Sequence, residues 1–353
     1  MEWAIVMAGG QGTRLWPASR QKNPKQFLKL FGKKTLIENT VERVRTVVPS
    51  KRIFIITDRA QQKRTQKLFP QIPASQIIGE PFGRNTAATI GLGAFLIQKK
   101  DPDAVIAVFP SDHVILNRSE FKKGVKRTYR WAAKGAHHVL FGVKPTFPST
   151  AYGYVEREVK QASEQIYRLR RLIEKPNFKK ASQFIKNKRF YWQAGIFIFR
   201  ADTILNSIKR FLPIHFRNLK RISDAWGNRK SGFPLSNLFA VLPNISIDYG
   251  VMEKLKLIFM VPARFDWNDI GSWNALENIW PKDSHGNSSF GPHVAHESTR
   301  NIAYSERLVS FSGVHDLIVI DSPDALLITS KKEAERVKDL VRYLADKKLT
   351  RYL

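Results

Sequence analysis

Residues 3–14 read WAIVMAGGQGTR, an apolar run that passes directly into a loop with three glycines. Consecutive apolar residues followed by glycine are typical of a buried strand in a parallel sheet. The glycines allow a tight turn and a close approach to a ligand, and consecutive backbone N–H groups can then hold phosphate oxygens. The loop is not a Walker A loop, since the pattern Gly-x-x-x-x-Gly-Lys-Ser/Thr is absent. It is not the dinucleotide fingerprint either, because Leu15 stands where the third glycine of that fingerprint would fall. On the glycines alone, a phosphate-binding loop and a plain turn are equally consistent.

The sequence that follows alternates between apolar, β-branched runs and helical patterns. The predicted strands are 3–8, 52–57, 104–109 and 138–143, and the predicted helices are 35–47, 85–100 and 119–134. The first helix opens with a capping box, Thr35 and Glu38. This alternation predicts an α/β fold with a doubly wound, mainly parallel sheet that is covered on both faces.

The character of the chain changes after residue 150. Further strands are predicted at 152–156, 167–174, 194–199 and 257–264, with helices at 179–187 and 201–211. From residue 283, short apolar runs separated by Gly, Ser, Pro, Asp and His predict a small all-β unit. A closing helix is predicted over 331–348, starting from a second capping box, Ser330 and Glu333. We therefore divide the chain into a domain over 1–282 and a β-rich C-terminal unit over 283–353.

The composition restricts the class of protein. The chain of 353 residues has no cysteine, which excludes disulfides, thiolate nucleophiles and cysteine-ligated zinc. Its net charge of +29 raises nucleic acid or an anionic membrane as partners. The basic residues are scattered, however, and residues 281–329 carry three Lys/Arg against six Asp/Glu, so we expect neither a specific nucleic-acid site nor a membrane site. The sequence shows no signal-peptide pattern and no apolar run of about 18 residues, which predicts a cytoplasmic protein.

Two short motifs follow the glycine loop, RLWP at 14–17 and PKQF at 24–27. Together with the loop they resemble the signature of the sugar-nucleotide pyrophosphorylases, and in particular that of the mannose-1-phosphate guanylyltransferase branch. The resemblance implies a Rossmann-like nucleotidyltransferase domain, and the tail is similar to the family's small β-helix-like unit. It also implies that the loop binds the nucleotide through Ala8, Gly9, Gly10, Gly12 and Thr13.

Arg14 and Lys25 are the catalytic candidates. An Arg fork binds phosphate oxygens bidentately, and Lys offers a point charge. Both side chains would stabilise the charge that builds on departing pyrophosphate. The alternative is that they are two solvated surface cations.

A second nucleotide motif is EPFGRNTA at 80–87, which resembles the family's segment around the base. The carboxylate of Glu80 could accept hydrogen bonds from guanine N1–H and its exocyclic amine. Asn85 or Thr86 could cap the following helix, whose N–H groups would meet the nucleotide; a capped turn is the alternative. The resemblance implies nucleotide contacts by Glu80, Arg84, Asn85 and Thr86. The family continues with Ala-Pro where this chain has Ala88-Thr89, a departure that we expect to matter little.

The metal ligands are predicted from PSDH at 110–113 and WNDIGSW at 267–273. The first motif follows a predicted strand of the parallel sheet, so it lies where α/β proteins bind ligands, and Asp112 is a natural Mg²⁺ ligand there. Ser111 is assigned to the nucleotide, and His113 is favoured as a core histidine over a catalytic acid. The resemblance implies Asp269 as the second ligand; by itself Asp269 would be interpreted as a capping residue in a packed corner.

Four segments resemble the family's sugar-phosphate site: YGY at 152–154, IEKP at 173–176, YWQAGIF at 191–197 and SIDYGVMEK at 246–254. The residues assigned to the sugar phosphate are Tyr152, Gly153, Glu174, Lys175, Gln193, Gly195 and Asp248. Gln193 stands where the family has Asn, so its contact is the least secure of the set. Asp248 either bonds the sugar or orients Lys175, and the sequence does not decide between these roles.

The expected reaction is transfer of GMP from GTP to mannose 1-phosphate, with Mg²⁺ as cofactor. The alternatives are a pyrophosphorylase for another hexose 1-phosphate or nucleoside triphosphate, a regulator whose catalytic site has been retired, and a nucleic-acid binder. A homodimer stays open, and no fused isomerase domain is expected. His293 and His296 have a metal-like spacing, but no third ligand accompanies them, so we do not expect zinc.

Overall fold

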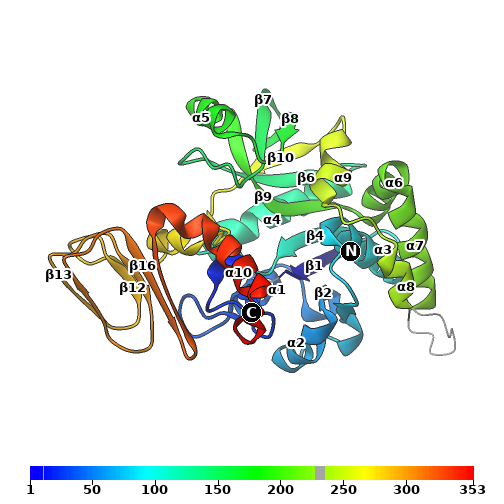
Figure 1. The fold of residues 1–353 in the computed structure, drawn as a ribbon. Helices are drawn as coiled ribbons and strands as arrows, with labels where there is room; N and C mark the ends of the chain where they lie inside the picture. Colours follow the sequence, from blue (N-terminus) through cyan, green and yellow to red (C-terminus); the bar gives the residue numbers. More distant parts are fainter. Residues whose placement is uncertain (11, 227–234) are drawn as a thin grey trace. The chain divides into compact units, whose positions relative to one another are not determined.

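The computed structural model describes residues 1–10, 12–226 and 235–353, and Figure 1 traces their fold. Packing divides the chain into two compact units. Unit 1 comprises residues 1–9, 41–110 and 115–267, and unit 2 comprises residues 10–40, 111–114 and 268–353.

Unit 1 is built on a nine-stranded sheet in the order β3-β2-β1-β4-β9-β6-β10-β8-β7. The strands are β1 (Glu2–Ala8), β2 (Ile53–Asp58), β3 (Ile77–Glu80), β4 (Val105–Pro110), β6 (Val139–Val143), β7 (Tyr154–Ser163), β8 (Ile166–Ile173), β9 (Phe190–Arg200) and β10 (Phe259–Pro262). The first four in this order are parallel, which is the expected doubly wound arrangement. Beyond β4 the sheet is mixed, because β9 runs antiparallel to β4, β6 and β7. Strand β3, which ends in Glu80, was not predicted.

Helices cover both faces of the parallel strands, as the sequence predicts. Helix α3 (Asn85–Lys100) shares a core cluster with Ile106 and Val108 of β4 and packs against α6 (Ala201–Phe211) and α7 (Pro213–Ala225), which lie together in Figure 1. Phe109 of β4 points to the other face and contacts Phe121 of α4 (Arg118–Ala133), with ring centroids 5.6 Å apart. Alternate residues of one strand therefore serve opposite faces. Helix α7 was missed in the sequence.

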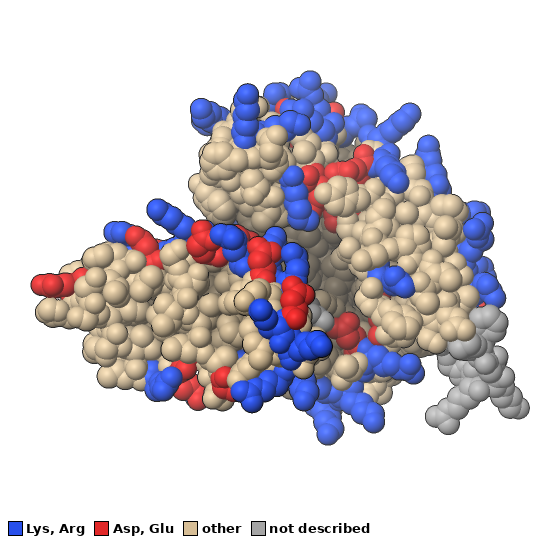
Figure 2. Space-filling view, viewed as in Figure 1, with Lys and Arg blue, Asp and Glu red and all other residues tan. Residues whose placement is uncertain are grey.

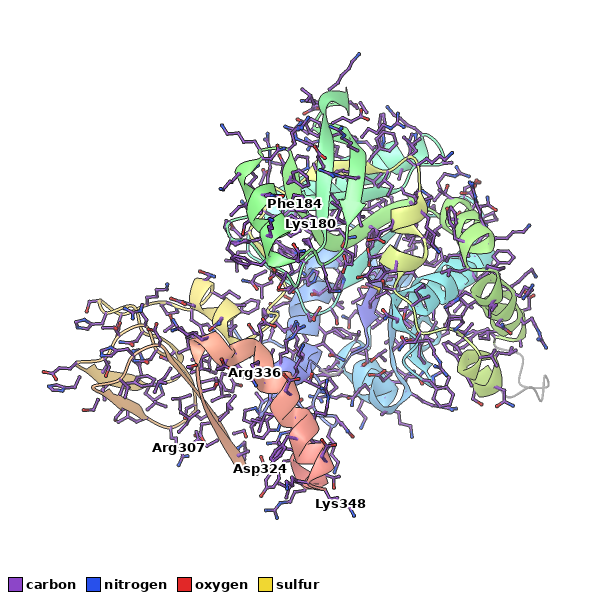
Figure 3. All side chains as sticks on the ribbon, turned by 45° about the horizontal axis from the view of Figure 1, so that its top comes forward. Lys180, Phe184, Arg307, Asp324, Arg336 and Lys348 are labelled. Atoms are coloured by element: carbon purple, nitrogen blue, oxygen red, sulfur yellow. The ribbon has the colours of Figure 1, made fainter. Side chains whose placement is uncertain are left out.

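A smaller aromatic core supports the far end of the sheet. Phe184 of α5 (Phe178–Lys186) stacks on Phe190 of β9 with centroids 4.2 Å apart. Lys180, one turn earlier on α5, is exposed, and Figure 3 labels both residues on this helix. The buried residues of α5 are Ala181 and Phe184, which are three positions apart and share one face, so the helix packs on the sheet through that face.

Unit 2 contains the expected β-helix-like coil. Strands β12 (Ser288–Phe290), β14 (Ile302–Tyr304) and β16 (Leu317–Ser322) stack in parallel, and β13 (His293–His296) pairs in parallel with β15 (Val309–Ser312). Strand β17 (Ala325–Ser330) adds an antiparallel edge to β16. His293 and His296 lie on β13, within the β-rich tail.

The closing helix consists of a 3₁₀ segment, Lys331–Arg336, followed by α10 (Val337–Asp346). The predicted capping box at its start was wrong, because the Ser330 side chain makes no capping bond and Glu333 pairs with Arg336 at 2.7 Å. At α1 (Leu36–Arg45) the capping box is confirmed: Thr35 N donates to Glu38 Oε2 at 2.8 Å, and Glu38 N donates to Thr35 Oγ1 at 3.4 Å.

Residues 10–40 share the core of the C-terminal part of unit 2. Leu15, Trp16 and Leu30 belong to one apolar cluster with Ile318 and Val337. Trp16 Nε1 also donates to the Tyr352 carbonyl oxygen at 2.7 Å. The segment after the glycine loop is therefore supported by the last residues of the chain.

None of the helices within the described ranges is long and apolar enough to cross a membrane. Lys and Arg side chains are spread over the face drawn in Figure 2 instead of gathering into one patch, in line with their scattered positions in the sequence.

Candidate functional site

The topology of unit 1 brings polar residues to one edge of the sheet. Strands β1, β2 and β3 are parallel and end at Ala8, Asp58 and Glu80. The carboxyl ends of parallel strands are where α/β proteins bind ligands. Thr57 Oγ1 donates to the Ala8 carbonyl oxygen at 3.0 Å, which fixes the start of the glycine loop.

Glu80 is a buried carboxyl group. It is 5% exposed and lies opposite Asp58 in the register of β2 and β3. Burial raises the pKa of Glu80 to about 8, and the charge of Asp58 acts in the same direction. Thr89 Oγ1, from the first turns of α3, donates to Glu80 Oε1 at 2.9 Å and acts in the opposite direction on this pKa. A buried carboxyl group with one hydroxyl donor can take further N–H donors from a ligand.

The rest of this motif makes internal bonds. Arg84 donates to the carbonyl oxygens of Phe239 (3.2 Å) and Ala240 (2.5 Å), at the end of α8 (Leu235–Ala240). Asn85 has a φ of 63°, and its Oδ1 accepts from Thr86 N at 2.9 Å. The expected cap was wrong, since the N-cap position of α3 is Arg84 and no side chain caps it.

Thr86 joins the start of α3 to the segment that carries Asp248. Thr86 Oγ1 accepts from Ile247 N at 2.9 Å, and Ala87 N donates to the Ile245 carbonyl oxygen at 3.4 Å. The base motif and the SIDY motif, distant in sequence, are therefore directly connected in unit 1.

The residues predicted for the sugar phosphate form one connected cluster. Gln193 Nε2 donates to Asp248 Oδ1 at 2.5 Å, and Gln193 N donates to the Gly153 carbonyl oxygen at 2.8 Å. Lys175 Nζ donates to Glu174 Oε1 at 2.7 Å. A Cβ atom at Gly153 would displace the Glu174 carboxylate from its present position.

The charges of this cluster are coupled. Burial raises the pKa of Asp248 to about 6, while the hydrogen bond from Gln193 lowers it. Partial burial lowers the pKa of Lys175, but the hydrogen bond and charge of Glu174 outweigh it, so that pKa is raised overall. A cation is thus held beside two carboxyl groups.

Tyr152 and Gly195 complete the predicted set. Tyr152 packs edge-on against Trp192 and Trp267, with centroids 5.0 and 5.5 Å away. Gly195 has a φ of 67°, a conformation that favours glycine within β9.

In unit 2 the glycine loop folds against Lys25. Gly10 and Gly12 have φ angles of 102° and 64°. A Cβ atom at Gly12 would collide with the Cβ atom of Lys25. Thr13 begins a 3₁₀ turn, Thr13–Leu15, and its carbonyl oxygen accepts from Trp16 N at 3.2 Å. Gly9, the last residue of the first segment of unit 1, has open space beside its Cα, and Gln11 lies outside the described residues.

Lys25 links the two predicted metal ligands. Its side chain is buried, and Nζ donates to Asp112 Oδ2 at 2.6 Å and to the main-chain carbonyl oxygen of Asp269 at 2.5 Å. Burial raises the pKa of Asp112, but the charges of Lys25 and His113 and the Lys25 hydrogen bond outweigh it, so the pKa is lowered overall. The Asp112 carboxylate therefore already attracts a cation.

The Asp269 turn and Ser111 are ordered by their own bonds. Gly271 N donates to Asp269 Oδ1 at 3.1 Å, and Ile270 has a φ of 46°. Ser111 is buried, and its carbonyl oxygen accepts from Thr40 Oγ1 at 3.2 Å. His113 is 8% exposed, which agrees with the preference for a core histidine.

A divalent cation fits this donor set. Mg²⁺ prefers one or two carboxylates together with phosphate oxygens, and Asp112 and Asp269 supply two carboxylates. Within the described residues no group of three or more His, Cys, Asp or Glu could hold a metal.

The Arg14 side chain also contacts residues of unit 2. Its Nε lies 3.2 Å from Glu335 Oε2, and Nη1 donates to the Gly271 carbonyl oxygen at 3.5 Å. Glu335 belongs to the 3₁₀ segment before α10. The sequence assigned no role to Glu335, which belongs to no motif, or to Thr89, which was treated as an unimportant departure from the family motif. Only the fold brings each of them to a predicted site residue.

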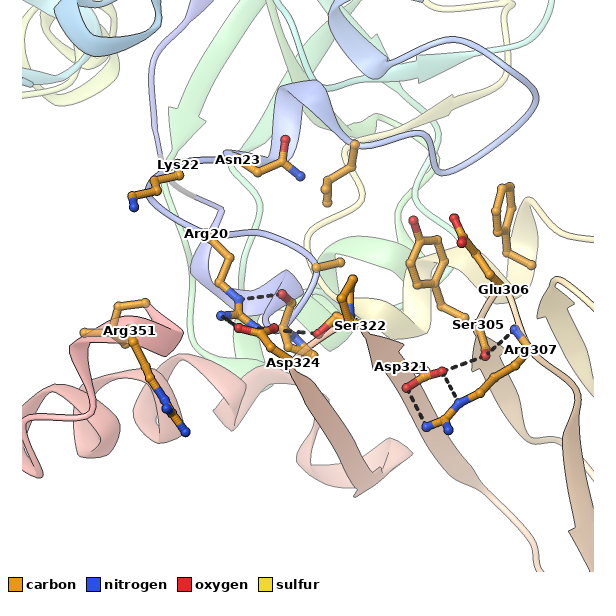
Figure 4. A pocket seen from close by; sticks show the side chains of 17 residues that line it. Arg20, Lys22, Asn23, Ser305, Glu306, Arg307, Asp321, Ser322, Asp324 and Arg351 are labelled. Atoms are coloured by element: carbon orange, nitrogen blue, oxygen red, sulfur yellow. Dashed lines mark hydrogen bonds and ion pairs between the residues drawn. The ribbon is translucent and has the colours of Figure 1, made fainter.

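A cavity of about 710 Å³ in unit 2 is not this site (Figure 4). None of the predicted site residues lines it. Two of its arginines are already paired: Arg20 with Asp324 at 2.8 Å and Arg307 with Asp321 at 2.7 Å. The size of this cavity therefore does not indicate a catalytic site.

Comparison with known proteins defines the class first. The nucleotidyl transferase family matches residues 3–285, and the MannoseP isomerase/GMP-like beta-helix domain matches residues 291–344. The fold and the first of these matches make the chain a nucleotidyltransferase.

The relatives narrow this class. The chain is 33% identical over 358 residues to mannose-1-phosphate guanylyltransferase of Escherichia coli, covering 99% of this chain and 75% of that one. It is 35% identical over 353 residues to mannose-1-phosphate guanylyltransferase RfbM of Salmonella typhimurium, covering 96% and 72%. The crystal structure of mannose-1-phosphate geranyltransferase from Thermus thermophilus matches with a TM-score of 0.89 and 34% identity, over 98% of this chain and 99% of that one. The chain belongs to the mannose-1-phosphate guanylyltransferase family.

Proposed function

We propose that the chain transfers GMP from GTP to mannose 1-phosphate, releasing pyrophosphate, with Mg²⁺ as cofactor. The observation that carries this proposal is the bridge from Lys25 Nζ to Asp112 and to the Asp269 turn, beside a glycine loop in which Gly12 leaves no room for a side chain. In this proposal, residues of unit 2 would bind the phosphates and the metal. Glu80 of unit 1 would recognise the base, and the cluster around Asp248 in the same unit would bind the sugar phosphate.

In the proposed reaction, a phosphate oxygen of mannose 1-phosphate attacks the α-phosphorus of GTP. The new O–P bond forms as the bond from the α-phosphorus to the bridging oxygen breaks, and pyrophosphate leaves with that electron pair. The attacking phosphate is already ionised at neutral pH, so no general base is needed. When bound, Mg²⁺ would neutralise phosphate charge at Asp112 and Asp269.

The chain's own residues would position the two substrates and stabilise the charge that develops during the reaction. Arg14 and Lys25 would compensate the negative charge that grows on pyrophosphate, a contribution worth about 10²–10³ in rate for one well-placed donor. The N–H groups of the loop formed by Ala8, Gly9, Gly10, Gly12 and Thr13 would hold the triphosphate, together with Ser111. Lys175 would bind the phosphate of the sugar, and Glu174, Gln193 and Asp248 its hydroxyl groups.

Arg84, Asn85 and Thr86 have a different part in this proposal. Because Arg84 and Thr86 bond to other segments of unit 1, they would shape the nucleotide site through the position of α3. Asn85 would present the start of that helix, and Tyr152, Gly153 and Gly195 would shape the sugar site through packing and backbone conformation.

The test is pyrophosphate release with Mg²⁺ from mannose 1-phosphate paired separately with GTP, ATP, UTP and dTTP, with glucose 1-phosphate as control. We expect release with mannose 1-phosphate and GTP. Release with another pair would retain the chemistry and transfer it to another sugar or nucleotide. Lack of release from folded protein with every pair would favour a retired, sugar-nucleotide-binding regulator.

A variant pair tests the residue that carries the proposal. Lys25→Met should lower kcat by about 10²–10³. Lys29→Met, at an exposed position of the same segment, should leave kcat unchanged. Equal rates for both variants would overturn the role of Lys25.

We also propose a nucleotidyltransferase domain over residues 1–282 and a small β-rich C-terminal unit over 283–353, together with a cytoplasmic location and a homodimer. Limited proteolysis tests the first, cell fractionation the second, and sedimentation the third.

A further inference from the structure

Thr89 lies in α3, nine residues after Glu80, and the fold turns its hydroxyl onto that carboxyl group. The Oγ1–Oε1 distance is 2.9 Å, and the two residues are 8% and 5% exposed. A hydrogen bond to a buried charged group contributes more than one at the surface, because water cannot replace the lost partner.

The surroundings of Glu80 otherwise oppose its charge. Asp58, at the end of the neighbouring strand, is the charged group that acts on Glu80 through space, and burial adds to its effect. The Thr89 hydroxyl is the donor that favours the carboxylate form. It also restricts rotation of the carboxylate about its Cγ–Cδ bond, since one oxygen is tied to the helix.

We propose that Thr89 is a positioning residue for base recognition, which orients Glu80 so that its ionised form accepts from both N–H groups of a guanine edge. This inference rests on the proposed function, in which Glu80 contacts the base. A carboxylate pairs with guanine N1–H and the exocyclic amine together, whereas adenine offers no such pair and hypoxanthine offers N1–H alone. Sites that hydrogen-bond a substrate group reject analogues without that group strongly, because a buried polar atom is left unpaired.

The experiment measures dissociation constants of GTP, ITP and ATP by calorimetry, for the wild type and for Thr89→Val, Thr89→Ser and Glu80→Gln. Val keeps the shape of Thr and removes its hydroxyl, and Ser keeps the hydroxyl. We expect Thr89→Val to weaken GTP binding about tenfold and to reduce the preference for GTP over ATP by the same factor. Thr89→Ser should remain within about twofold of the wild type.

A second readout separates positioning from mere packing. For the wild type, GTP binding should strengthen as pH rises and Glu80 ionises. Thr89→Val should move this transition to higher pH, because it removes a donor that favours the carboxylate. Asp58→Asn should move it to lower pH, because it removes a neighbouring negative charge. A packing defect would move neither transition in these directions.

The outcomes are distinguishable. If Glu80→Gln loses the GTP preference and Thr89→Val keeps it with an unshifted pH transition, the inference on Thr89 is overturned and the proposed function stands. If Glu80→Gln keeps the preference, or the wild type has none, the role of Glu80 fails and the inference fails with it. If Thr89→Val is unstable by thermal unfolding, the pH transition of Thr89→Ala replaces it in the comparison.

Discussion

Glu335 forms an ion pair with Arg14, with Oε2 and Nε 3.2 Å apart, although 321 positions separate the two residues in the sequence. Arg14 is the cation assigned to the triphosphate, so the C-terminal segment of unit 2 already presents it with a carboxylate. Both side chains are partly exposed, 37% and 55%, so the pair contributes little to stability.

We therefore expect Glu335→Gln to lower KM for GTP by about twofold to fivefold, since an anion that competes with the triphosphate is removed. The free energy of unfolding should change by less than about 1 kcal/mol. Glu333→Gln is the matched control, because Glu333 pairs with Arg336 in the same segment. The measurement is steady-state kinetics at varied GTP concentration. A raised KM in Glu335→Gln alone would mean that Glu335 orients Arg14 and does not compete with the triphosphate for it.

Gly12→Ala and Gly32→Ala form a second matched pair. Both glycines have a φ near 65°, so both substitutions carry the same backbone strain, about 1 kcal/mol or more. Only at Gly12 would the new Cβ atom collide with Lys25, since nothing lies within 4 Å at Gly32. We expect a loss of thermal stability in both variants, larger in Gly12→Ala because of this collision, and a fall in kcat/KM of at least about tenfold in Gly12→Ala alone. Equal activities would show that contact with the loop does not position Lys25.

Asp112→Asn and Asp269→Asn test the metal. Each substitution removes one carboxylate from the pair, so the affinity for Mn²⁺, followed by electron paramagnetic resonance in the presence of GTP, should fall at least about tenfold. Asp316→Asn is the control, since Asp316 pairs with Arg300 at the exposed edge of the coil. Mn²⁺ affinity that is insensitive to both changes would remove these residues from the metal site.

Glu80 should make stability depend on pH. The folded state keeps a proton on Glu80 up to pH about 8, whereas the unfolded chain releases it near its ordinary pKa of 4.5. Stability from this group is therefore complete below pH 4.5 and is lost as pH rises to about 8. As the pH rises from 5 to 8, the free energy of unfolding of Glu80→Gln, measured in urea, should therefore increase relative to that of the wild type by an amount on the order of a few kcal/mol. Glu164→Gln, at a side chain that is 80% exposed, should show no such trend; a flat difference for Glu80→Gln would contradict the raised pKa.

Gln193→Asn restores the residue that the family has at this position and tests the effect of the longer Gln side chain. Asn is shorter by one methylene, so the bond to Asp248 Oδ1 should be lost while the backbone bond to Gly153 remains. We expect KM for mannose 1-phosphate to rise about threefold to tenfold with KM for GTP unchanged, the cost of about one hydrogen bond. Gln161→Asn, on the exposed part of β7, is the control. A lower KM would mean that Asn reaches the sugar better than Gln does.

The sequence by itself determined the strands that begin unit 1, the helices over 85–100 and 201–211, and the β-helix-like tail. The spacing of apolar residues and the positions of glycines predict these elements, because the burial of one face of a helix or strand depends on spacing within that element alone. The PKQF motif of the family resemblance pointed to Lys25, and the position after a predicted strand pointed to Asp112; the structure joins the two side chains by a 2.6 Å contact.

Only the tertiary structure decided which polar groups meet. Thr89 reaches Glu80 because β3 and α3 are packed together, and Glu335 reaches Arg14 because residues 10–40 share a core with the C-terminal coil. Neither pairing leaves a periodic signal, since a hydrogen bond between distant elements depends on the three-dimensional placement of two atoms. For the same reason a strand as short as β3, whose end carries Glu80, is recognised from its neighbour β2 and not from its own four residues.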